Sequence, residues 1–335
     1  MNLSRRHGVP MLLLVWCVLA PAAALITASI TACQSTPKSA GSAAAVKLSP
    51  EEQKKLDEYK AEMEIGRNMA GRLLAFFGTN GDERLRGYVN QVGNYVASYS
   101  DFPDRRYMFA ILDTEMVNAF ACPGGYILIT QGALRAATNE AELGMILGHE
   151  VAHVGRQHMF NTLKAMDEAE AAKTAAEGEQ LTEVPQAVKM RQRVKPVELE
   201  ATRKITRYLG TSQMAGIGIL QAAKAGMSLM LEKGLDQKLE FEADQEGVKY
   251  AVRAGYEPNA LKNFLARLDE AAKRKKAAGK KSSGDMGKTH PAGQERMARI
   301  DTLLKDVLGA DEIIGATGAE RFAKLKERLP AARSN

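Results

Sequence analysis

The run HEVAH at 149–153 constrains the fold of this chain more than any other feature of its sequence. It lies in an apolar stretch with Ile146, Leu147, Val151 and Val154. Apolar residues at this spacing predict a helix with a buried face. Residues four positions apart project from the same face of a helix. The two histidines of the run are therefore expected to lie side by side.

The helix that carries this run has a recognisable start. Asn139 offers a capping side chain, and Glu142 supplies the acid that often follows three positions later. His149 and His153 can then share one zinc ion, because imidazole nitrogens bind zinc at about 2.1 Å. The alternative is an ordinary helix with two surface histidines. With only five histidines in the chain, a chance HExxH is improbable.

Glu150, directly after the first of these histidines, gives the run its chemistry. In zinc peptidases this carboxylate does not bind the metal but takes a proton from water and passes it to the leaving amine. Zinc makes this workable near neutral pH, because it lowers the pKa of bound water to about 7 and polarises the scissile carbonyl. The pattern predicts a zinc endopeptidase with one zinc ion per chain and Glu150 as general base.

A catalytic zinc needs a third protein ligand and an open fourth position. His7 lies near the N-terminus, and His158 follows His153 by five positions, off the ligand face. We expect His158 and the lysine-rich run 273–281 to be surface features. The third ligand is therefore expected to be an acid or His290.

Three acids on a predicted downstream helix are the candidates. Glu240 could reach the metal, while Asp244, one turn on, accepts a hydrogen bond from the far nitrogen of a ligand histidine. On charge alone Glu242 is an alternative ligand, and the acids could equally form a solvated helix face. The presence of HEVAH favours a metal site.

The first residues predict export. Arg5 and Arg6 precede the apolar stretch 10–30, which has the layout of a secretory signal. It runs into ITAC, which resembles the lipobox of bacterial lipoproteins, with Cys33 as the lipidated N-terminus. The alternative is an uncleaved signal anchor, since about 20 apolar residues can cross a bilayer. Gln34 after the cysteine is similar to lipoproteins sent to the outer membrane.

Composition divides the chain into segments. Residues 1–32 form the predicted signal peptide, and residues 33–47 a small, polar, flexible tether. Residues 48–310 form the predicted metallopeptidase domain, in which the charged insertion 166–202 is a lid or merely a loop. Residues 311–335 add a C-terminal helix and tail. Removing the signal takes away two positive charges and lowers the formal charge from +6 to +4, which is too small to argue for a nucleic-acid partner.

The hydrophobic pattern predicts a mainly helical α+β fold with a small mixed or antiparallel sheet. The stretch 214–230 is long and apolar enough to raise the question of a membrane span, but Gln221 and Lys224 favour a buried or groove-lining helix. Strands are expected at 107–112, 116–121 and 126–130, and helices at 50–77, 82–99, 235–254, 259–278, 294–308 and 319–329.

Four motifs in order resemble one known family. They are NAFACPGGYILITQGAL, HEVAH, LEFEADQEG and THPAGQER. Over about 48–308 the chain resembles the metallopeptidase family of the CAAX prenyl proteases and the bacterial HtpX heat-shock protease. With no expected membrane helix after its signal, it is similar to the periplasmic lipoprotein branch associated with outer-membrane protein quality control.

The resemblance implies roles outside HEVAH. It assigns Glu240 as the third zinc ligand and Asp244 as its partner in orienting the site. It makes 118–130 an edge strand on which an extended peptide substrate adds by main-chain pairing, whereas the hydrophobic pattern alone predicts a core strand. Cys122 is expected to be a small buried hydrophobe and not a nucleophile. The substrate-strand residues are Asn118, Ala119, Phe120, Gly124 and Gly125.

His290, just before Pro291, has two interpretations. In similar periplasmic relatives a histidine here approaches the metal and fills its open position, so that the enzyme is latent until the loop moves. Otherwise His290 is a substrate-side or capping residue. Arg296 is expected to pair with an active-site acid or with substrate.

These inferences predict a zinc endopeptidase of the bacterial envelope, lipid-anchored in the periplasm and on the outer membrane. Its expected substrates are misfolded or stalled envelope proteins. The alternative is an outer-membrane assembly or chaperone-like factor with a largely latent zinc site. The predicted partners are protein or peptide substrates, the membrane, and outer-membrane assembly proteins.

Overall fold

The computed structural model describes residues 48–177, 213–277, 279, 290, 294–308 and 315–332. All of them belong to the second of two compact units, Leu48–Asn335. The predicted signal peptide, the tether, lipidation at Cys33 and most of the insertion 166–202 lie outside the described residues.

Helices make up most of the described chain, and capping side chains explain several of their starts. Ser49 accepts a hydrogen bond from the Glu52 backbone, and the Glu52 carboxylate accepts one from Ser49 in return. Asp82 and Asn139 cap the next long helices through their side chains. The helices are α1 (Pro50–Phe77), α2 (Glu83–Ser98), α3 (Gln131–Ala136), α4 (Glu140–Gly155), α5 (His158–Glu177), α7 (Gln213–Ser228), α8 (Gln237–Arg253), α9 (Ala260–Ala277), α11 (Gln294–Leu308) and α12 (Ala319–Lys326), with a π-helical turn η2 (Leu229–Lys233) after α7.

One three-stranded sheet completes the fold, and the expected α+β class is confirmed. Strand β1 (Met108–Leu112) is parallel to the central β3 (Tyr126–Thr130), and β2 (Ala119–Cys122) is antiparallel to β3. The order β1-β3-β2 makes the sheet mixed and puts β2 at an edge. The short turn η1 (Pro123–Gly125) joins β2 to β3.

Strand β2 begins three residues later than the sequence predicts. The Thr130 hydroxyl donates to the carbonyl oxygen of Met116 and accepts from the backbone amide of Asn118. The Thr130 amide still donates to the carbonyl oxygen of Asn118, but the Thr130 side chain binds the Asn118 amide and the Met116 carbonyl, where further backbone pairing was expected.

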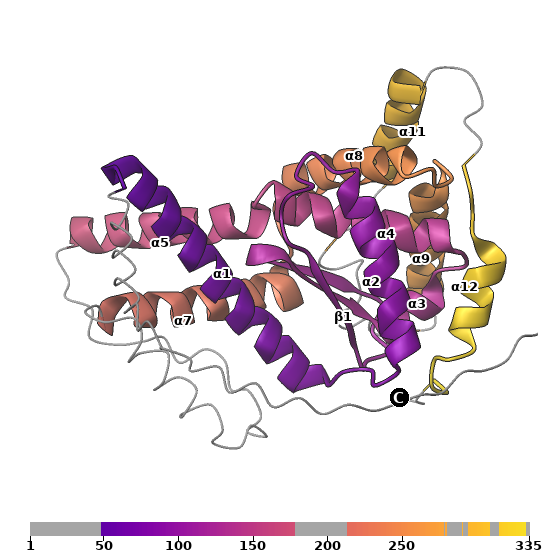
Figure 1. Ribbon diagram of the computed structural model, residues 1–335, viewed down its shortest axis with the longest axis horizontal. Helices are drawn as coiled ribbons and strands as arrows, with labels where there is room; N and C mark the ends of the chain where they lie inside the picture. The colour runs from indigo at the N-terminus through magenta and orange to yellow at the C-terminus, as the bar shows by residue number, and fades with distance from the viewer. Residues whose placement is uncertain are drawn as a thin grey trace, which may run out of the picture. The chain divides into compact units, whose positions relative to one another are not determined.

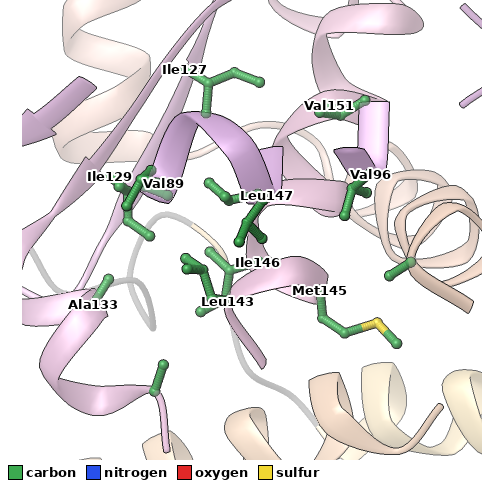
Figure 2. Packing of buried hydrophobic residues seen from close by; sticks show 14 of the residues in the cluster. Val89, Val96, Ile127, Ile129, Ala133, Leu143, Met145, Ile146, Leu147 and Val151 are labelled. Carbon is green, nitrogen blue, oxygen red and sulfur yellow. The ribbon is translucent and has the colours of Figure 1, made fainter. Parts of the chain in front are cut away.

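The two faces of the sheet pack against different helices, because successive strand residues point to opposite faces. Ile127 and Ile129 belong to one cluster, here called the scaffold cluster, which includes buried residues of α2, α4, α8, α9, α11 and α12. Figure 2 shows its centre, where Leu143 and Leu147 of α4 lie near Val89 and Val96 of α2.

The opposite face belongs to a smaller cluster, here called the pocket cluster. Leu128 and Phe120 of the sheet pack there with residues of α1, α5, α7 and η2. Figure 1 shows α1, α5 and α7 grouped on one side of the strands, with α4, α8, α9 and α12 on the other. The members of the pocket cluster are Ile65, Met69, Ala70, Leu73, Leu112, Phe120, Cys122, Leu128, Met159, Phe160, Leu163, Ala223, Leu229 and Met230.

Helix α7 covers most of the apolar stretch 214–230. It packs against α1 and α5, and Ala223 on it is fully buried. Within the described ranges, no helix combines the length and apolarity that a membrane span requires. Of the α7 residues whose burial is described, only Ala223 and Gly226 are buried, so this helix is half-buried and not fully enclosed as expected.

The start of α4 is held by a buried carboxylate. Glu140 accepts hydrogen bonds from Tyr88 of α2 and from Tyr256 after α8, and it pairs with Arg321 of α12. Phe322, the next residue of α12, is fully buried in the scaffold cluster. Helix α12 thus belongs to the same packed unit, and these contacts fix the helix that carries HEVAH.

Candidate metal centre

The predicted ligands come from two helices that cross at very short distance. A Cβ atom added to Gly247 of α8 would lie 2.6 Å from the His149 backbone nitrogen, and one on Gly148 of α4 would lie 2.8 Å from the Gly247 carbonyl oxygen. Only glycine fits at such a close approach. The crossing brings HEVAH on α4 beside Glu240 and Asp244 on α8.

Four side chains converge at this crossing. His149, His153, Glu240 and His290 each offer one ligand atom, and these atoms all lie within 4.8 Å of one another. Nε2 of His149 is 3.0 Å from Nε2 of His153 and 3.4 Å from Oε2 of Glu240, and Nε2 of His153 is 3.5 Å from Oε1 of Glu240. Two ligands bound at about 2.1 Å to a tetrahedral zinc lie about 3.4 Å apart. The spacing therefore fits a zinc ion.

Unpaired carboxylate oxygens support the same fit. Both oxygens of Glu150 and Oε1 of Glu240 are buried with no hydrogen-bond partner in the described part of the chain. A buried polar atom without a partner is costly, so such atoms usually mark a bound ion, a water or a catalytic role. A cation beside Glu240 and a water beside Glu150 would satisfy these atoms.

The His149 ring is oriented by a carboxylate. Its Nδ1 lies 3.0 Å from Oδ1 of Asp244. Arg296 of α11 in turn donates two hydrogen bonds of 2.6 Å to the two oxygens of Asp244. A third N–H of Arg296 donates to the His290 carbonyl oxygen at 3.1 Å. Two partners were expected for Arg296, an active-site acid or the substrate. The structure shows the acid, Asp244.

His290 lies inside the ligand cluster. Its Nδ1 is 2.7 Å from Oε2 of Glu240 and 3.4 Å from Nε2 of His149. Of its two interpretations, this geometry favours the approach to the metal. Glu240 thus faces three imidazole rings at once.

Neighbouring charges separate the pKa values of the two histidines on α4. Burial lowers the pKa of His149, but its hydrogen bonds to Asp244 and Glu240 outweigh this effect and raise that pKa to about 10. Burial lowers the pKa of His153 well below its usual value, because the attraction of Glu240 alone does not compensate. Burial also raises the pKa of Glu150. A carboxylate with a raised pKa is a stronger acceptor of protons.

The expected substrate strand lies beside this centre. Ala119 and Phe120 of β2 line a pocket together with Glu150, His153 and His290. Asn118 is buried before β2, where its side chain accepts a hydrogen bond from the Ala119 amide.

Two glycines end this strand in a tight turn. Gly124 and Gly125 have φ angles of 71° and 94°, a region that favours glycine. The Gly124 amide donates to the buried carboxylate of Glu62 on α1. The sequence analysis did not single out Glu62 as a residue of this site. A single glutamate in a charged helical segment carries no pattern that would predict its burial.

The expectation that His158 is a surface residue is wrong. Its side chain is only 4% exposed, and its Nδ1 lies 2.9 Å from Nδ1 of His153. The reason is a break in the helix: α4 ends at Gly155, and Gln157 has φ 56° before α5 starts at His158. By contrast, Lys273 of the lysine-rich run is 66% exposed, as expected.

Glu242 stands apart from the four-residue cluster. Its Oε2 faces Nε2 of His158 at 3.4 Å, and its side chain is 43% exposed. The geometry therefore favours Glu240 over Glu242 as the acid at the metal.

Cys122 is fully buried at the end of β2. Burial and the nearby Glu150 carboxylate raise the pKa of its thiol. Because the reactive form of cysteine is the thiolate, this position is inert. The expectation of a buried hydrophobe is confirmed.

Comparisons with known proteins show similarity to metallopeptidases. The model of peptidase family M48 matches residues 83–304. The beta-barrel assembly-enhancing protease of Yersinia pestis is 27% identical over 196 residues, covering 57% of this chain and 34% of that protein. Its Escherichia coli K12 counterpart is 24% identical over 237 residues, covering 71% and 42%.

A mitochondrial relative shows a comparable sequence identity. The mitochondrial metalloendopeptidase OMA1 of Schizosaccharomyces pombe is 24% identical over 227 residues, covering 65% of this chain and 53% of that protein. The chain thus spans less than half of the length of the two bacterial relatives and about half of this one.

Proposed function

The chain belongs to peptidase family M48, and from this premise we propose that it is a zinc-dependent endopeptidase. The observation that carries the proposal is the Glu150 carboxylate. Both of its oxygens are buried without a partner among the described residues, beside a cluster of ligand atoms with zinc spacing. A buried carboxylate that receives no hydrogen bond from a protein donor and lies next to a metal site is suited to accept a proton.

Each residue has a distinct role in this proposal. His149, His153 and Glu240 would hold the zinc ion, with Asp244 fixing the ring of His149. Zinc supplies a lowered water pKa and a polarised scissile carbonyl. Glu150 takes the proton of the attacking water and delivers it to the leaving amine.

The edge strand supports the binding of an extended peptide. Because β3 is the one neighbour of β2 in the sheet as far as the described residues go, the outer main-chain groups of β2 can pair with a substrate strand. A peptide bound there runs past Glu150, since Ala119 and Phe120 share a pocket with that carboxylate. This geometry supports cleavage within a chain.

The same pocket supports a substrate class. Beyond the predicted zinc ligands it is lined by apolar side chains of β2, α5, η2 and the loop after η2, namely Phe120, Met159, Leu229, Met230 and Leu235. It suits an apolar side chain next to the scissile bond. Misfolded or stalled proteins expose such side chains, and the predicted export signal suggests proteins of the cell envelope.

We also propose a location and partners. The run ITAC ending at Cys33 supports a lipid anchor, in the periplasm and on the outer membrane. Relatives named beta-barrel assembly-enhancing proteases support outer-membrane assembly proteins as partners.

His290 favours a second candidate function. Its Nδ1 lies among the ligand atoms, where it would close the position that a substrate carbonyl needs. With that position closed, the chain would act as an assembly or chaperone-like factor with a latent zinc site.

One experiment separates the two functions. The chain from Cys33 to Asn335 is purified as wild type, Glu150→Gln and His290→Ala, and zinc content and casein cleavage are measured together. We expect one zinc per chain in wild type and Glu150→Gln, loss of cleavage in Glu150→Gln, and faster cleavage in His290→Ala. Unchanged cleavage by Glu150→Gln would overturn the peptidase proposal, and zinc without cleavage in any variant would favour the binding role.

A further inference from the structure

The two histidines of HEVAH have different partners on their outer nitrogens. Nδ1 of His149 faces the Asp244 carboxylate at 3.0 Å. Nδ1 of His153 instead faces another imidazole, Nδ1 of His158, at 2.9 Å. His158 takes no part in the proposed proton transfer, yet it is buried and in direct contact with a predicted ligand.

Hydrogen-bond roles follow from which nitrogen faces the cluster. Nε2 of His153 lies 3.0 Å from Nε2 of His149 and 3.5 Å from Oε1 of Glu240, so it is the nitrogen that would bind a metal. A ligand nitrogen carries no proton, so the proton of the neutral His153 ring resides on Nδ1. Only one proton fits between two ring nitrogens at hydrogen-bond distance, so Nδ1 of His158 must accept it.

The remaining proton of His158 then has a defined position. A neutral imidazole that accepts at Nδ1 carries its proton on Nε2. That nitrogen lies 3.4 Å from Oε2 of Glu242, without the geometry of a hydrogen bond. The hydrogen-bond contact that starts at the cluster therefore runs from His153 to His158, and the partly exposed Glu242 carboxylate lies nearby.

A break in the helix brings His158 to this position. In an unbroken helix, a residue five positions after His153 points about 140° away from it. Gln157 interrupts the helix with φ 56°, which is uncommon for a residue other than glycine. The side-chain amide of Gln157 donates a hydrogen bond of 2.5 Å to Oε2 of Glu62. A contact with α1 thus supports the turn that returns His158 beneath His153.

We propose that His158 is a positioning residue of the metal centre, whose Nδ1 accepts the hydrogen bond that fixes the tautomer and ring orientation of His153. It serves His153 as Asp244 serves His149. This inference rests on the proposed zinc site but not on peptide cleavage. Loss of such a partner typically lowers metal affinity about 10- to 100-fold.

The test measures zinc affinity by competition with a chelator of known affinity, on the chain Cys33–Asn335. His158→Leu removes the acceptor and keeps an apolar group of similar bulk. His158→Asn keeps an acceptor, because its amide oxygen can occupy the place of Nδ1. Thermal unfolding of each zinc-free variant shows whether it is folded.

We expect His158→Leu to lose about 10- to 100-fold in zinc affinity and His158→Asn to recover most of that loss. Wild-type affinity in His158→Leu would overturn the proposal. Equal losses in both variants would also overturn it, because packing of the ring would then explain the effect. If His158→Leu does not fold, His158→Asn decides, since the proposal requires it to bind zinc nearly as wild type does.

The affinity readout separates this proposal from the proposed function. A wild-type chain that binds zinc without cleaving casein would remove the peptidase assignment, and the affinities of the His158 variants would still decide the role of His158. A wild-type chain that binds no zinc would overturn both.

Discussion

The two clusters on opposite faces of the sheet differ in composition and in what they do. The scaffold cluster consists mainly of aliphatic residues and contains one methionine, Met145. The smaller pocket cluster contains Met69, Met159 and Met230. Two of these methionines line the cavity beside Glu150.

The difference separates the positioning of chemical groups from the contact with substrate. Helices α4 and α8, which carry the predicted ligands, are embedded in the scaffold cluster, where closely packed aliphatic side chains hold them in place. The pocket has flexible thioethers on its wall, which adapt to side chains of different shapes. Substitutions on the scaffold side should therefore act on stability and metal binding, and those on the pocket side on substrate choice.

The largest effect is expected where a buried charge on the scaffold side loses its partner. Arg296→Met leaves Asp244 with one hydrogen bond fewer on each oxygen and no guanidinium beside it. Breaking a buried ion pair in this way costs about 3–5 kcal/mol. Urea unfolding of the zinc-free chain measures the change.

The matched control lies one turn away on α11. Arg299 is 58% exposed, so Arg299→Met should change stability by no more than about 1 kcal/mol. Equal midpoints for the two variants would mean that the Arg296–Asp244 pair does not stabilise the scaffold.

A smaller loss is expected at the crossing of α4 and α8. The new Cβ atom in Gly247→Ala would lie 2.6 Å from the His149 backbone nitrogen, so the helices must separate. Overpacking of this kind costs about 1–3 kcal/mol, and displacement of Glu240 should also weaken zinc binding.

The same substitution on α2 gives the control. Nothing lies within 4 Å of a Cβ added to Gly87, so Gly87→Ala should stabilise the chain by up to about 1 kcal/mol through helix propensity. If both variants gain stability, the crossing has room that the geometry does not indicate.

Local sequence signals predict the helices and the HEVAH site better than they predict the position of His158. Caps at Ser49 and Asn139, the HEVAH spacing and the E-x-x-x-D pattern all follow from contacts within a few residues, and the helices and sheet class follow from them. The position of His158 does not. It depends on a turn at Gln157 that is stabilised by Glu62, 95 residues away, and the positive φ falls on Gln157 and not on Gly155, the last residue of α4. Tertiary contacts of that kind leave no periodic trace in a sequence.

On the pocket side, Met230→Ala should change substrate choice as well as stability. Shortening this side chain enlarges the cavity beside Glu150. A missing methylene-sized group in an apolar pocket is worth about a tenfold change in discrimination. Two peptides that differ only in carrying leucine or phenylalanine at one position can be compared. The ratio of kcat/KM for the phenylalanine peptide to kcat/KM for the leucine peptide should therefore rise about tenfold in this variant.

The control for this prediction is Met145→Ala in the scaffold cluster. Met145 is fully buried away from the cavity, so its loss should lower stability and leave the ratio of kcat/KM values unchanged. An unchanged ratio in Met230→Ala would contradict the assignment of the pocket to the substrate side chain.

The smallest effect is expected at the outer edge of the scaffold side, where Asp82 caps α2 and pairs with Arg328. Hydrogen bonds from Arg328 and the Leu85 amide lower the pKa of Asp82 from 3.8 to about 2. Since the folded-state pKa is the lower one, this pair stabilises the fold above about pH 4, and its contribution disappears as the pH falls toward 2.

In Arg328→Met the pKa of Asp82 should rise toward its usual value. Urea unfolding of the zinc-free wild type and variant between pH 5 and pH 3 should therefore give midpoints that converge as the solution becomes more acidic. Midpoints that stay equally far apart, or diverge, would mean that Arg328 acts through packing and not through the charge of Asp82.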